Sequence, residues 1–309
     1  DFPGLAAEWM VEKNGGLHAD EVRFGSDKKR WWICAEGHEW LASPNQRTSL
    51  KTGCPYCFKA NVTGGAGLYG RQIVEALAEA GADTYIASRN IESLQQVAEE
   101  ETKRGYKVTA LQLDLSQEDS IEKLYNDIIE KSGKCDVLIN NAVSREHGSL
   151  GWDNSLDDFD KSLRINASAL FKITNMFAEG MKKNKSGSII NIGSMMGTVG
   201  VENGNYEGTD FTPATSPLYF YEKGGMHNFT RWAASMLGPF NIRVNCLAPG
   251  GFKVPSHPDR FVENYSKRTQ LGRMANSTDL KGPIIFLASD SSAYLTGTII
   301  AVDGGYTAK

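Results

Sequence analysis

The sequence predicts an α/β protein built on a doubly wound parallel sheet, with a small zinc-binding module in front of it. Two observations predict the sheet. From residue 59 onward, short apolar runs of strand length alternate with amphipathic stretches of helix length. A glycine-rich turn stands between the first of these strands and the first helix. A cluster of cysteine and histidine in the first 58 residues predicts the zinc module.

The composition is that of an ordinary globular protein. The 309 residues are 40% hydrophobic and 23% charged, and this length exceeds one dinucleotide-binding domain. A net charge of −4 gives no general attraction to nucleic acid or to an anionic membrane. The longest apolar stretches have strand length and no signal peptide is visible. We therefore expect a cytoplasmic protein without membrane contact.

Residues 1–58 carry the spacing of a metal site. Cys34-x-x-x-His38 is followed by Cys54-Pro-Tyr-Cys57. Three thiolates and one imidazole suit tetrahedral Zn²⁺, and four protein ligands leave no open position, so the metal would be structural. It would supply folding energy that so small a unit cannot obtain from apolar burial. A redox-active Cys54-x-x-Cys57 pair is the alternative interpretation.

The zinc unit runs without a linker into the second part, so we expect domains of 1–58 and 59–309. Lys59-Ala-Asn-Val62 would be the first strand of the sheet. Such a strand lies mid-sheet with both faces covered and is normally apolar throughout, a pattern that Lys59 and Asn61 break. Either the zinc unit replaces the usual start of this strand, or the chain is an unusual fusion.

The turn Thr63-Gly-Gly-Ala-Gly-Leu-Tyr-Gly70 opens the first helix of the sheet domain. Its glycines permit a tight turn and a close approach of the backbone to a pyrophosphate at the helix N-terminus. Further strands are predicted at 84–87, 108–113 and 136–140, each followed by a helical stretch.

The second half carries residue types suited to proton transfer. One long helix is expected over 156–183, and the apolar strand that follows ends at Ser194. Tyr219 and Lys223 lie four apart, which places them on one face of a helix. An ammonium held near a phenol favours the phenolate and lowers the phenol's pKa toward working pH. Strands at 241–247 and 297–302 complete the predicted sheet.

In this order and spacing, the motifs resemble the short-chain dehydrogenase/reductase family over residues 59–309. The resemblance implies a Rossmann-like sheet and a nicotinamide cofactor. It implies that Asn166 holds a proton-relay water and that Ser194 binds the substrate carbonyl oxygen. Tyr219 would exchange the proton, while Lys223 would lower its pKa and hold the nicotinamide ribose. The cofactor-binding residues it implies are Thr63, Gly64, Gly67, Leu68, Gly70, Ser88, Arg89, Asp114, Asn141, Tyr219, Lys223, Pro249 and Gly250.

Two residues at the end of the second strand bear on the choice of cofactor. A carboxylate at this place would bind the ribose 2′-hydroxyl and repel a 2′-phosphate. Ser88 stands there instead, and Arg89 offers a guanidinium to phosphate. This favours NADP over NAD, with a solvated arginine at a helix start as the alternative.

The first 58 residues closely resemble a treble-clef, probable zinc-ribbon family. The resemblance rests on Trp31-Trp-Ile-Cys-Ala-Glu-Gly-His-Glu-Trp40 and Gly53-Cys-Pro-Tyr-Cys57. Modules of this family are suspected of contacting nucleic acid or protein. Nucleic-acid binding is a weak expectation here, because Lys28-Lys29-Arg30 is the sole basic cluster in a unit of balanced charge.

The chain departs from the dehydrogenase pattern in several places. Leu68 replaces the middle glycine of the turn and Val143 replaces the glycine after Asn-Asn-Ala. Ser194 and Tyr219 are 25 residues apart, more than is usual, and a similar insert occurs in relatives suspected of acting on sugars. Polar insert residues would then line the pocket: Asn205, Glu207, Thr209 and Asp210. A surface loop that touches nothing is the alternative. Residues 252–276 are expected to form a mobile substrate lid, with His257 solvated.

We therefore expect an NADP(H)-dependent oxidoreductase that acts on a small carbonyl or secondary-alcohol substrate, such as a sugar or polyol. A homodimer or homotetramer is expected from the family. A second hypothesis is a zinc-anchored binding or regulatory protein whose dehydrogenase fold senses cofactor without turnover. A third has the zinc unit recruit the enzyme to nucleic acid.

Overall fold

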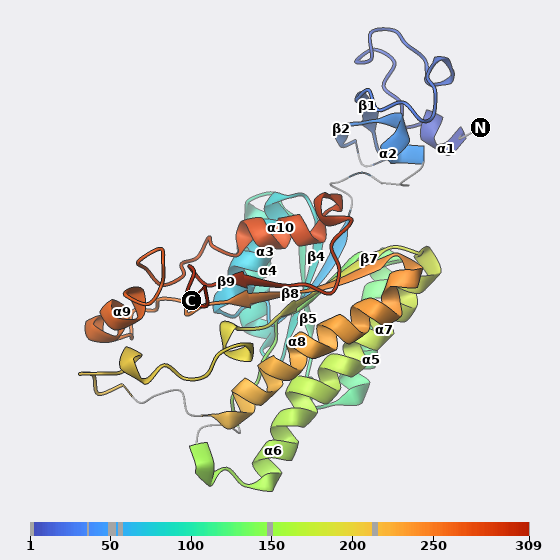
Figure 1. The fold of residues 1–309 in the computed structure, drawn as a ribbon. Coiled ribbons are helices and arrows are strands. Elements are labelled where there is room, and N and C mark those ends of the chain that lie inside the picture. The colour runs from blue at the N-terminus through green and yellow to red at the C-terminus, as the bar shows by residue number, and fades with distance from the viewer. Residues whose placement is uncertain are drawn as a thin grey trace.

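The computed structural model describes residues 3–35, 37–48, 54, 58–146, 151–211 and 216–308. These residues form an N-terminal module and a larger α/β domain (Figure 1). Each has its own hydrophobic core. The predicted doubly wound sheet and the small module before it are both confirmed.

The N-terminal module is built around an antiparallel pair of strands, β1 (Arg30–Ile33) and β2 (Glu39–Ala42). Short helices α1 (Pro3–Ala6) and α2 (Pro44–Thr48) flank the pair. Its core is aromatic, and the Trp9 and Trp32 rings meet edge to face at 5.0 Å. The buried Arg47 guanidinium lies 5.2 Å and 5.1 Å from the Trp32 and Trp40 ring centres and forms an ion pair with Glu8. This cation–π arrangement stabilises a core with few aliphatic residues.

The α/β domain contains a seven-stranded sheet in the order β5-β4-β3-β6-β7-β8-β9, with every described pairing parallel. The strands are β3 (Lys59–Thr63), β4 (Asp83–Ser88), β5 (Val108–Gln112), β6 (Val137–Asn140), β7 (Gly187–Ile192), β8 (Ile242–Pro249) and β9 (Ile299–Val302). The chain crosses from β5 to the other side of β3, where β6 pairs. In such sheets, ligands bind at this switch point, beyond the carboxyl ends of the strands.

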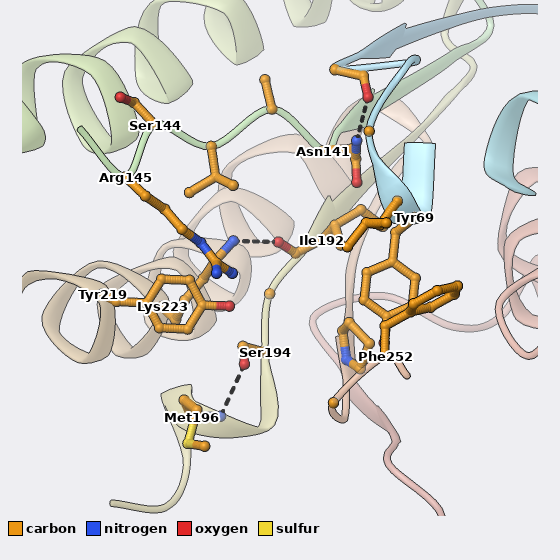
Figure 2. A pocket seen from close by; sticks show the side chains of 18 of the residues that line it. Tyr69, Asn141, Ser144, Arg145, Ile192, Ser194, Met196, Tyr219, Lys223 and Phe252 are labelled. Atoms are coloured by element: carbon orange, nitrogen blue, oxygen red, sulfur yellow. Dashed lines mark hydrogen bonds between the residues drawn. The ribbon is translucent and has the colours of Figure 1, made fainter. Parts of the chain in front are cut away.

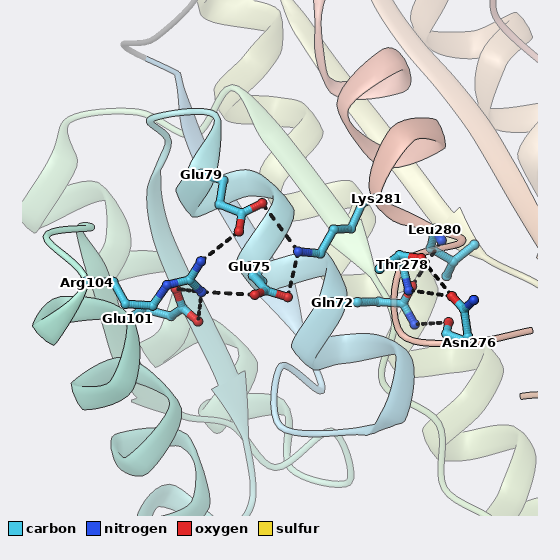
Figure 3. Close-up of polar contacts among 9 residues, drawn as sticks. All are labelled: Gln72, Glu75, Glu79, Glu101, Arg104, Asn276, Thr278, Leu280 and Lys281. Atoms are coloured by element: carbon cyan, nitrogen blue, oxygen red, sulfur yellow. Dashed lines mark hydrogen bonds and ion pairs between the residues drawn. The ribbon is translucent and has the colours of Figure 1, made fainter. Parts of the chain in front are cut away.

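Helices cover both faces of the sheet (Figure 1). One face packs against α3 (Leu68–Glu79), α4 (Ile91–Lys103) and α10 (Lys281–Ala288). The other face packs against α5 (Glu118–Ser132), α7 (Ala169–Asn184) and α8 (Pro217–Leu237). Polar contacts also join α10 to α3: Lys281 Nζ lies 2.7 Å from Glu75, and the Leu280 amide donates to Gln72 at 3.0 Å (Figure 3).

The polar first strand does lie mid-sheet, between β4 and β6. Lys59 is the first residue of this strand, where its Nζ pairs with Asp83 at 3.0 Å and its backbone amide donates to Asp136 at 2.9 Å. Asn61 is fully buried opposite Tyr85 and Leu138, and both polar atoms of its side chain lack a hydrogen-bond partner among the described residues. The charge of Lys59 is therefore paired, whereas the unsatisfied side chain of Asn61 lowers the stability of the fold.

Two predicted elements differ from the structure. The single helix expected over 156–183 is α6 (Leu156–Leu163), a π-helical turn (Arg164–Ser168) and α7. Such a turn inserts one extra residue per turn and frequently marks a functional site. The region 252–276, expected to be an irregular lid, contains α9 (Asp259–Ser266), whose Phe261 and Tyr265 are buried.

Candidate active site

A cavity of about 960 Å³ opens at the carboxyl ends of β3, β4, β6, β7 and β8. The glycine turn forms one wall and the start of α8 forms another. Predicted site residues that line it are Gly64, Gly67, Leu68, Gly70, Ser88, Arg89, Asp114, Asn141, Ser194, Tyr219, Lys223, Pro249 and Gly250. Cavities that hold cofactors and drug-sized ligands reach this size.

The glycine turn is compact enough to let a ligand approach its backbone. Gly64 has φ of +70°, and a Cβ there would lie 3.0 Å from Asn141 Nδ2. A Cβ on Gly70 would overlap the Gly64 carbonyl oxygen. Leu68, which replaces the middle glycine of the family pattern, lines the cavity and is 61% exposed. Its side chain therefore does not disturb the close contacts of Gly64 and Gly70. The turn thus fits the pyrophosphate of a dinucleotide at the start of α3.

Thr63 and Asn141 tie the ends of β3 and β6 together beneath the cavity. The Thr63 hydroxyl accepts from the amides of Asn141 and Ala142, both at 3.0 Å. Asn141 Nδ2 donates to the carbonyls of Thr63 at 3.1 Å and Gly64 at 3.0 Å (Figure 2). Thr63 is buried and does not line the cavity, so its place is behind the turn.

The charged groups at the end of β4 are arranged around Arg89. Its guanidinium pairs with Glu146 at 2.5 Å, and this bond raises the pKa of Arg89. Arg89 is more than half exposed, and Ser88 and Asp114 line the cavity beside it. Asp114 accepts hydrogen bonds from the Ser116 amide at 2.9 Å and the Ser116 hydroxyl at 2.8 Å, which holds its carboxylate in place.

Tyr219 and Lys223 lie one helical turn apart near the start of α8, as the spacing predicts. Lys223 Nζ lies 5.8 Å from the Tyr219 ring centre and donates to the Ile192 carbonyl at 2.7 Å. Burial lowers the pKa of Lys223, and the positive charge of Arg145 lowers it further. The Arg145 guanidinium carbon lies 4.8 Å from the Tyr219 ring centre (Figure 2). Two basic side chains, Arg145 and Lys223, thus lie within 6 Å of the ring centre of one tyrosine.

Ser194 and Asn166 occupy different places relative to the cavity. Ser194 lines it at the end of β7, and its hydroxyl accepts from the Met196 amide at 3.1 Å (Figure 2). Asn166 lies behind the cavity wall in the π-helical turn, where its side chain bonds Ser144, Ser162 and Glu222. Its side-chain amide is therefore engaged by protein groups.

Among the cavity residues that the sequence did not predict are three with polar side chains near the motifs: Tyr69, Arg145 and Glu222. Tyr69 donates to the Gly250 carbonyl at 2.7 Å and so links the glycine turn to the Pro249–Gly250 turn. Glu222 is a buried carboxylate, and burial raises its pKa. No spacing in the sequence singled these residues out, although Tyr69 and Glu222 lie next to motif residues and Arg145 lies two residues after Val143.

The insert after Ser194 does reach the cavity, but mainly with other residues than predicted. Asn205 lines the cavity, as do the rings of Tyr206 and Phe211. Glu207 and Asp210 are exposed, and Thr209 turns its hydroxyl to the Tyr206 carbonyl. The predicted polar lining by Glu207, Thr209 and Asp210 is therefore wrong, because the turn points its aromatic side chains inward.

His257, expected to be solvated, instead packs with Phe211 and Phe261, which contact Tyr206, and these four rings form an aromatic wall of the cavity. Its ring lies 5.7 Å from Phe211 and 5.1 Å from Phe261, and burial lowers its pKa. A neutral imidazole among aromatic rings is a packing group with one polar edge. The part of the cavity lining formed by Tyr206, Phe211, His257 and Phe261 is thus mostly apolar.

The N-terminal module brings three of the four predicted metal ligands together, while Cys57 lies outside the described residues. The ligand atoms of Cys34, His38 and Cys54 lie within 4.8 Å of one another. His38 Nδ1 is 3.4 Å from the Cys34 sulfur and 3.9 Å from the Cys54 sulfur. Around tetrahedral zinc, nitrogen and sulfur ligands lie about 3.6 Å apart, so this arrangement fits the metal.

Within the part of the chain that the structure describes, no helix has the length and apolar character needed to cross a membrane.

Known proteins resemble both parts of the chain. A family model described as enoyl-(acyl carrier protein) reductase matches residues 67–307, and one described as a probable treble clef zinc finger domain matches residues 5–60. A 3-oxoacyl-[acyl-carrier-protein] reductase of Thermotoga maritima is 31% identical over 79% of this chain and 95% of its own. A cyclopentanol dehydrogenase of Comamonas is 32% identical over 80% of this chain and 96% of its own.

Solved structures of oxidoreductases also resemble the α/β domain. A short-chain type dehydrogenase/reductase from Mycobacterium marinum superposes with a TM-score of 0.71 at 28% identity, over 82% of this chain and 96% of the other. A gluconate 5-dehydrogenase from Burkholderia cenocepacia, solved with NADP and tartrate, gives 0.72 at 27% identity over the same shares. The chain therefore belongs to the short-chain dehydrogenase/reductase family of oxidoreductases and carries a treble-clef-like module at its N-terminal end.

Proposed function

We propose that this protein is an NADP(H)-dependent oxidoreductase that interconverts a carbonyl and a secondary alcohol. The observation that carries the proposal is the meeting of Tyr219, Lys223 and Ser194 at one cavity with the glycine turn. A nicotinamide bound there supplies or accepts the hydride. The protein's own residues hold the substrate and move the proton.

The role of each residue follows from its position. The Ser194 hydroxyl faces the cavity and binds the oxygen of the reacting group. Tyr219 donates its proton to this oxygen during reduction and accepts it during oxidation. Lys223, fixed by the Ile192 carbonyl, keeps its amino group 5.8 Å from the Tyr219 ring centre and holds the nicotinamide ribose. Asn166 acts from behind the wall by holding the polar groups around it.

Three features support NADP over NAD. Ser88 leaves the end of β4 without a carboxylate, and Arg89 offers a guanidinium at the cavity rim. The related gluconate 5-dehydrogenase was solved with NADP. Glu146 holds Arg89 in the structure, so a 2′-phosphate would compete with this carboxylate for the same guanidinium.

We propose a small substrate whose ring or chain packs against the aromatic wall. The lining by Tyr206, Phe211 and His257 supports flat, partly apolar contact, while Asn205 offers one polar group. A sugar or polyol satisfies both, since sugar rings carry apolar faces as well as hydroxyls. The named relatives act on substrates as different as cyclopentanol and 3-oxoacyl groups, so the fold by itself does not select among them.

A cofactor-oxidation screen tests the proposal. Purified full-length protein is mixed with NADPH or NADH and a panel of aldoses, ketoses, cyclic ketones and 3-oxo esters, and the reverse reaction is run with the alcohols. We expect turnover with at least one carbonyl and a preference for NADPH. Tight cofactor binding without turnover on any substrate would favour the cofactor-sensing alternative.

The zinc module and the assembly complete the proposal. We propose that the boundary between the units lies at residues 58 and 59 and that Cys34, His38, Cys54 and Cys57 hold a structural Zn²⁺ in a reducing, cytoplasmic setting.

Exposed apolar side chains on α7 and α8 support a homodimer or homotetramer: Phe171 is 51%, Trp232 51% and Met236 55% exposed. Sedimentation analysis of a Trp232→Glu variant tests the assembly. We expect this variant to sediment as a species of lower mass than the wild-type oligomer.

A further inference from the structure

Glu222 places a buried carboxylate on the catalytic helix that the proposed reaction leaves unused. It precedes Lys223 on α8 and is 7% exposed. Two donors hold it: the Ser162 hydroxyl at 2.6 Å and the Asn166 amide nitrogen at 3.0 Å. These donors come from α6 and from the π-helical turn, so the carboxylate joins the catalytic helix to the neighbouring wall.

Asn166 extends this contact to the loop that follows β6. Its amide nitrogen also donates to the Ser144 carbonyl at 2.8 Å, and its oxygen accepts from the Ser144 amide at 2.8 Å. A side-chain amide bonded to both backbone groups of one residue fixes that residue's peptide planes. The next residue is Arg145, whose guanidinium carbon lies 4.8 Å from the Tyr219 ring centre (Figure 2).

We propose that Glu222 is a positioning residue of the active site: through Asn166 and Ser144, it sets the place of the Arg145 guanidinium over Tyr219. The path begins and ends on α8, because Tyr219 and Glu222 lie three residues apart on that helix. Arg145, together with Lys223, then presents positive charge to the reacting phenol. The kinetic readout of this inference rests on the proposed function.

A double-mutant cycle between Glu222 and Arg145 tests the path, since no direct hydrogen bond or ion pair between these two residues is found in the described part of the chain. In the wild-type background, Arg145→Met should lower kcat/KM by about tenfold. In a Glu222→Leu background, the same replacement should lower it by less than about twofold, because the guanidinium is already displaced. If Arg145→Met lowers kcat/KM by the same factor in both backgrounds, the two residues act independently and the proposal is overturned.

Glu222→Gln is the matched control. Its amide oxygen still accepts from Asn166, and its amide nitrogen can donate to the Ser162 hydroxyl. We expect this variant to restore the dependence on Arg145 that Glu222→Leu removes. A glutamine variant that behaves like the leucine variant would contradict positioning through hydrogen bonds. If Glu222→Leu does not fold in a thermal melt, Glu222→Ala, which admits cavity water, takes its place in the cycle.

Amide hydrogen exchange at Ser144 gives a readout that needs no turnover. Glu222→Leu should accelerate exchange of this amide about tenfold or more, and Glu222→Gln should not, because Asn166 keeps its partner. Unchanged exchange in Glu222→Leu would overturn the inference. Absence of turnover in the wild-type protein, with the exchange result as expected, would instead contradict the proposed function and leave the positioning established.

Discussion

Asn61 offers a test of how the central strand of the sheet tolerates a polar residue. Its side chain is fully buried on β3, beside Tyr85 and Leu138, and neither amide atom has a partner among the described residues. We predict that Asn61→Leu stabilises the protein. Leucine has the same branched shape, so the change removes two unsatisfied polar atoms without enlarging the side chain greatly.

The expected gain follows from the cost of an unsatisfied buried group. Leaving such a group without a partner costs about 1–3 kcal/mol, and replacing it by an apolar group of the same shape recovers that cost. For a domain of this size, each kcal/mol raises the melting temperature by roughly 2–4 °C. The variant should therefore melt about 2–10 °C above the wild type, once packing strain is subtracted.

Calorimetry and urea unfolding of both proteins measure this difference, and Asn191→Leu is the matched control. Asn191 is equally buried on β7, but its amide donates to Thr230 at 3.0 Å and its oxygen accepts from Asn140 at 2.9 Å. The same substitution there should destabilise by about 1–3 kcal/mol, because it leaves these partners unsatisfied. If Asn61→Leu lowers stability as much as Asn191→Leu does, Asn61 is hydrogen-bonded in solution and the reasoning fails.

Three further predictions concern the cofactor and the metal. Arg89→Ala should weaken NADPH binding by about 1.5–3 kcal/mol and spare NADH, because only NADPH carries the 2′-phosphate; titration with each cofactor measures this, and equal losses would contradict it. Glu146→Gln should tighten NADPH binding by about threefold or more, since it removes the carboxylate that pairs with Arg89, and looser binding would show that Glu146 instead holds Arg89 in place. Zinc removal by a chelator should lower thermal stability and weaken NADPH binding together, because β3 begins two residues after Cys57 and carries the glycine turn, while Co²⁺ should restore both. Metal-free protein that binds NADPH as tightly as the zinc form would show the two units to be independent.

Much of the fold could be predicted because its signals are local. The alternation of strand and helix patterns, the glycine turn and the four-residue spacing of Tyr219 and Lys223 all depend on neighbours in the sequence. The place of Lys59 could not be predicted, because its partners are distant in the sequence: Asp83 begins β4 and Asp136 directly precedes β6. The break in the long helix was also missed, because the apolar positions on either side of it keep helical spacing in the sequence.

The candidate site shows the same division between local and distant signals. Most predicted site residues line one cavity, at the ends of strands and on α8, whereas Thr63 and Asn166 lie behind its wall. The aromatic wall was not predicted, because the sequence of the insert does not show which of its side chains point into the cavity. In the structure these include Tyr206 and Phe211. Glu222 was missed because its partners, Ser162 and Asn166, lie on segments about sixty residues earlier in the chain.

Turnover by Tyr219→Phe tests the central claim most directly. The substitution removes one hydroxyl and keeps the ring that Arg145 and Lys223 approach. With the best carbonyl found in the screen, the account predicts that kcat falls by about 10²–10⁴, the usual contribution of a general acid. The dissociation constant for NADPH, measured by fluorescence titration on the same preparation, should stay within about twofold of wild type. Retention of more than half the wild-type kcat would contradict the assignment of Tyr219 as the proton donor.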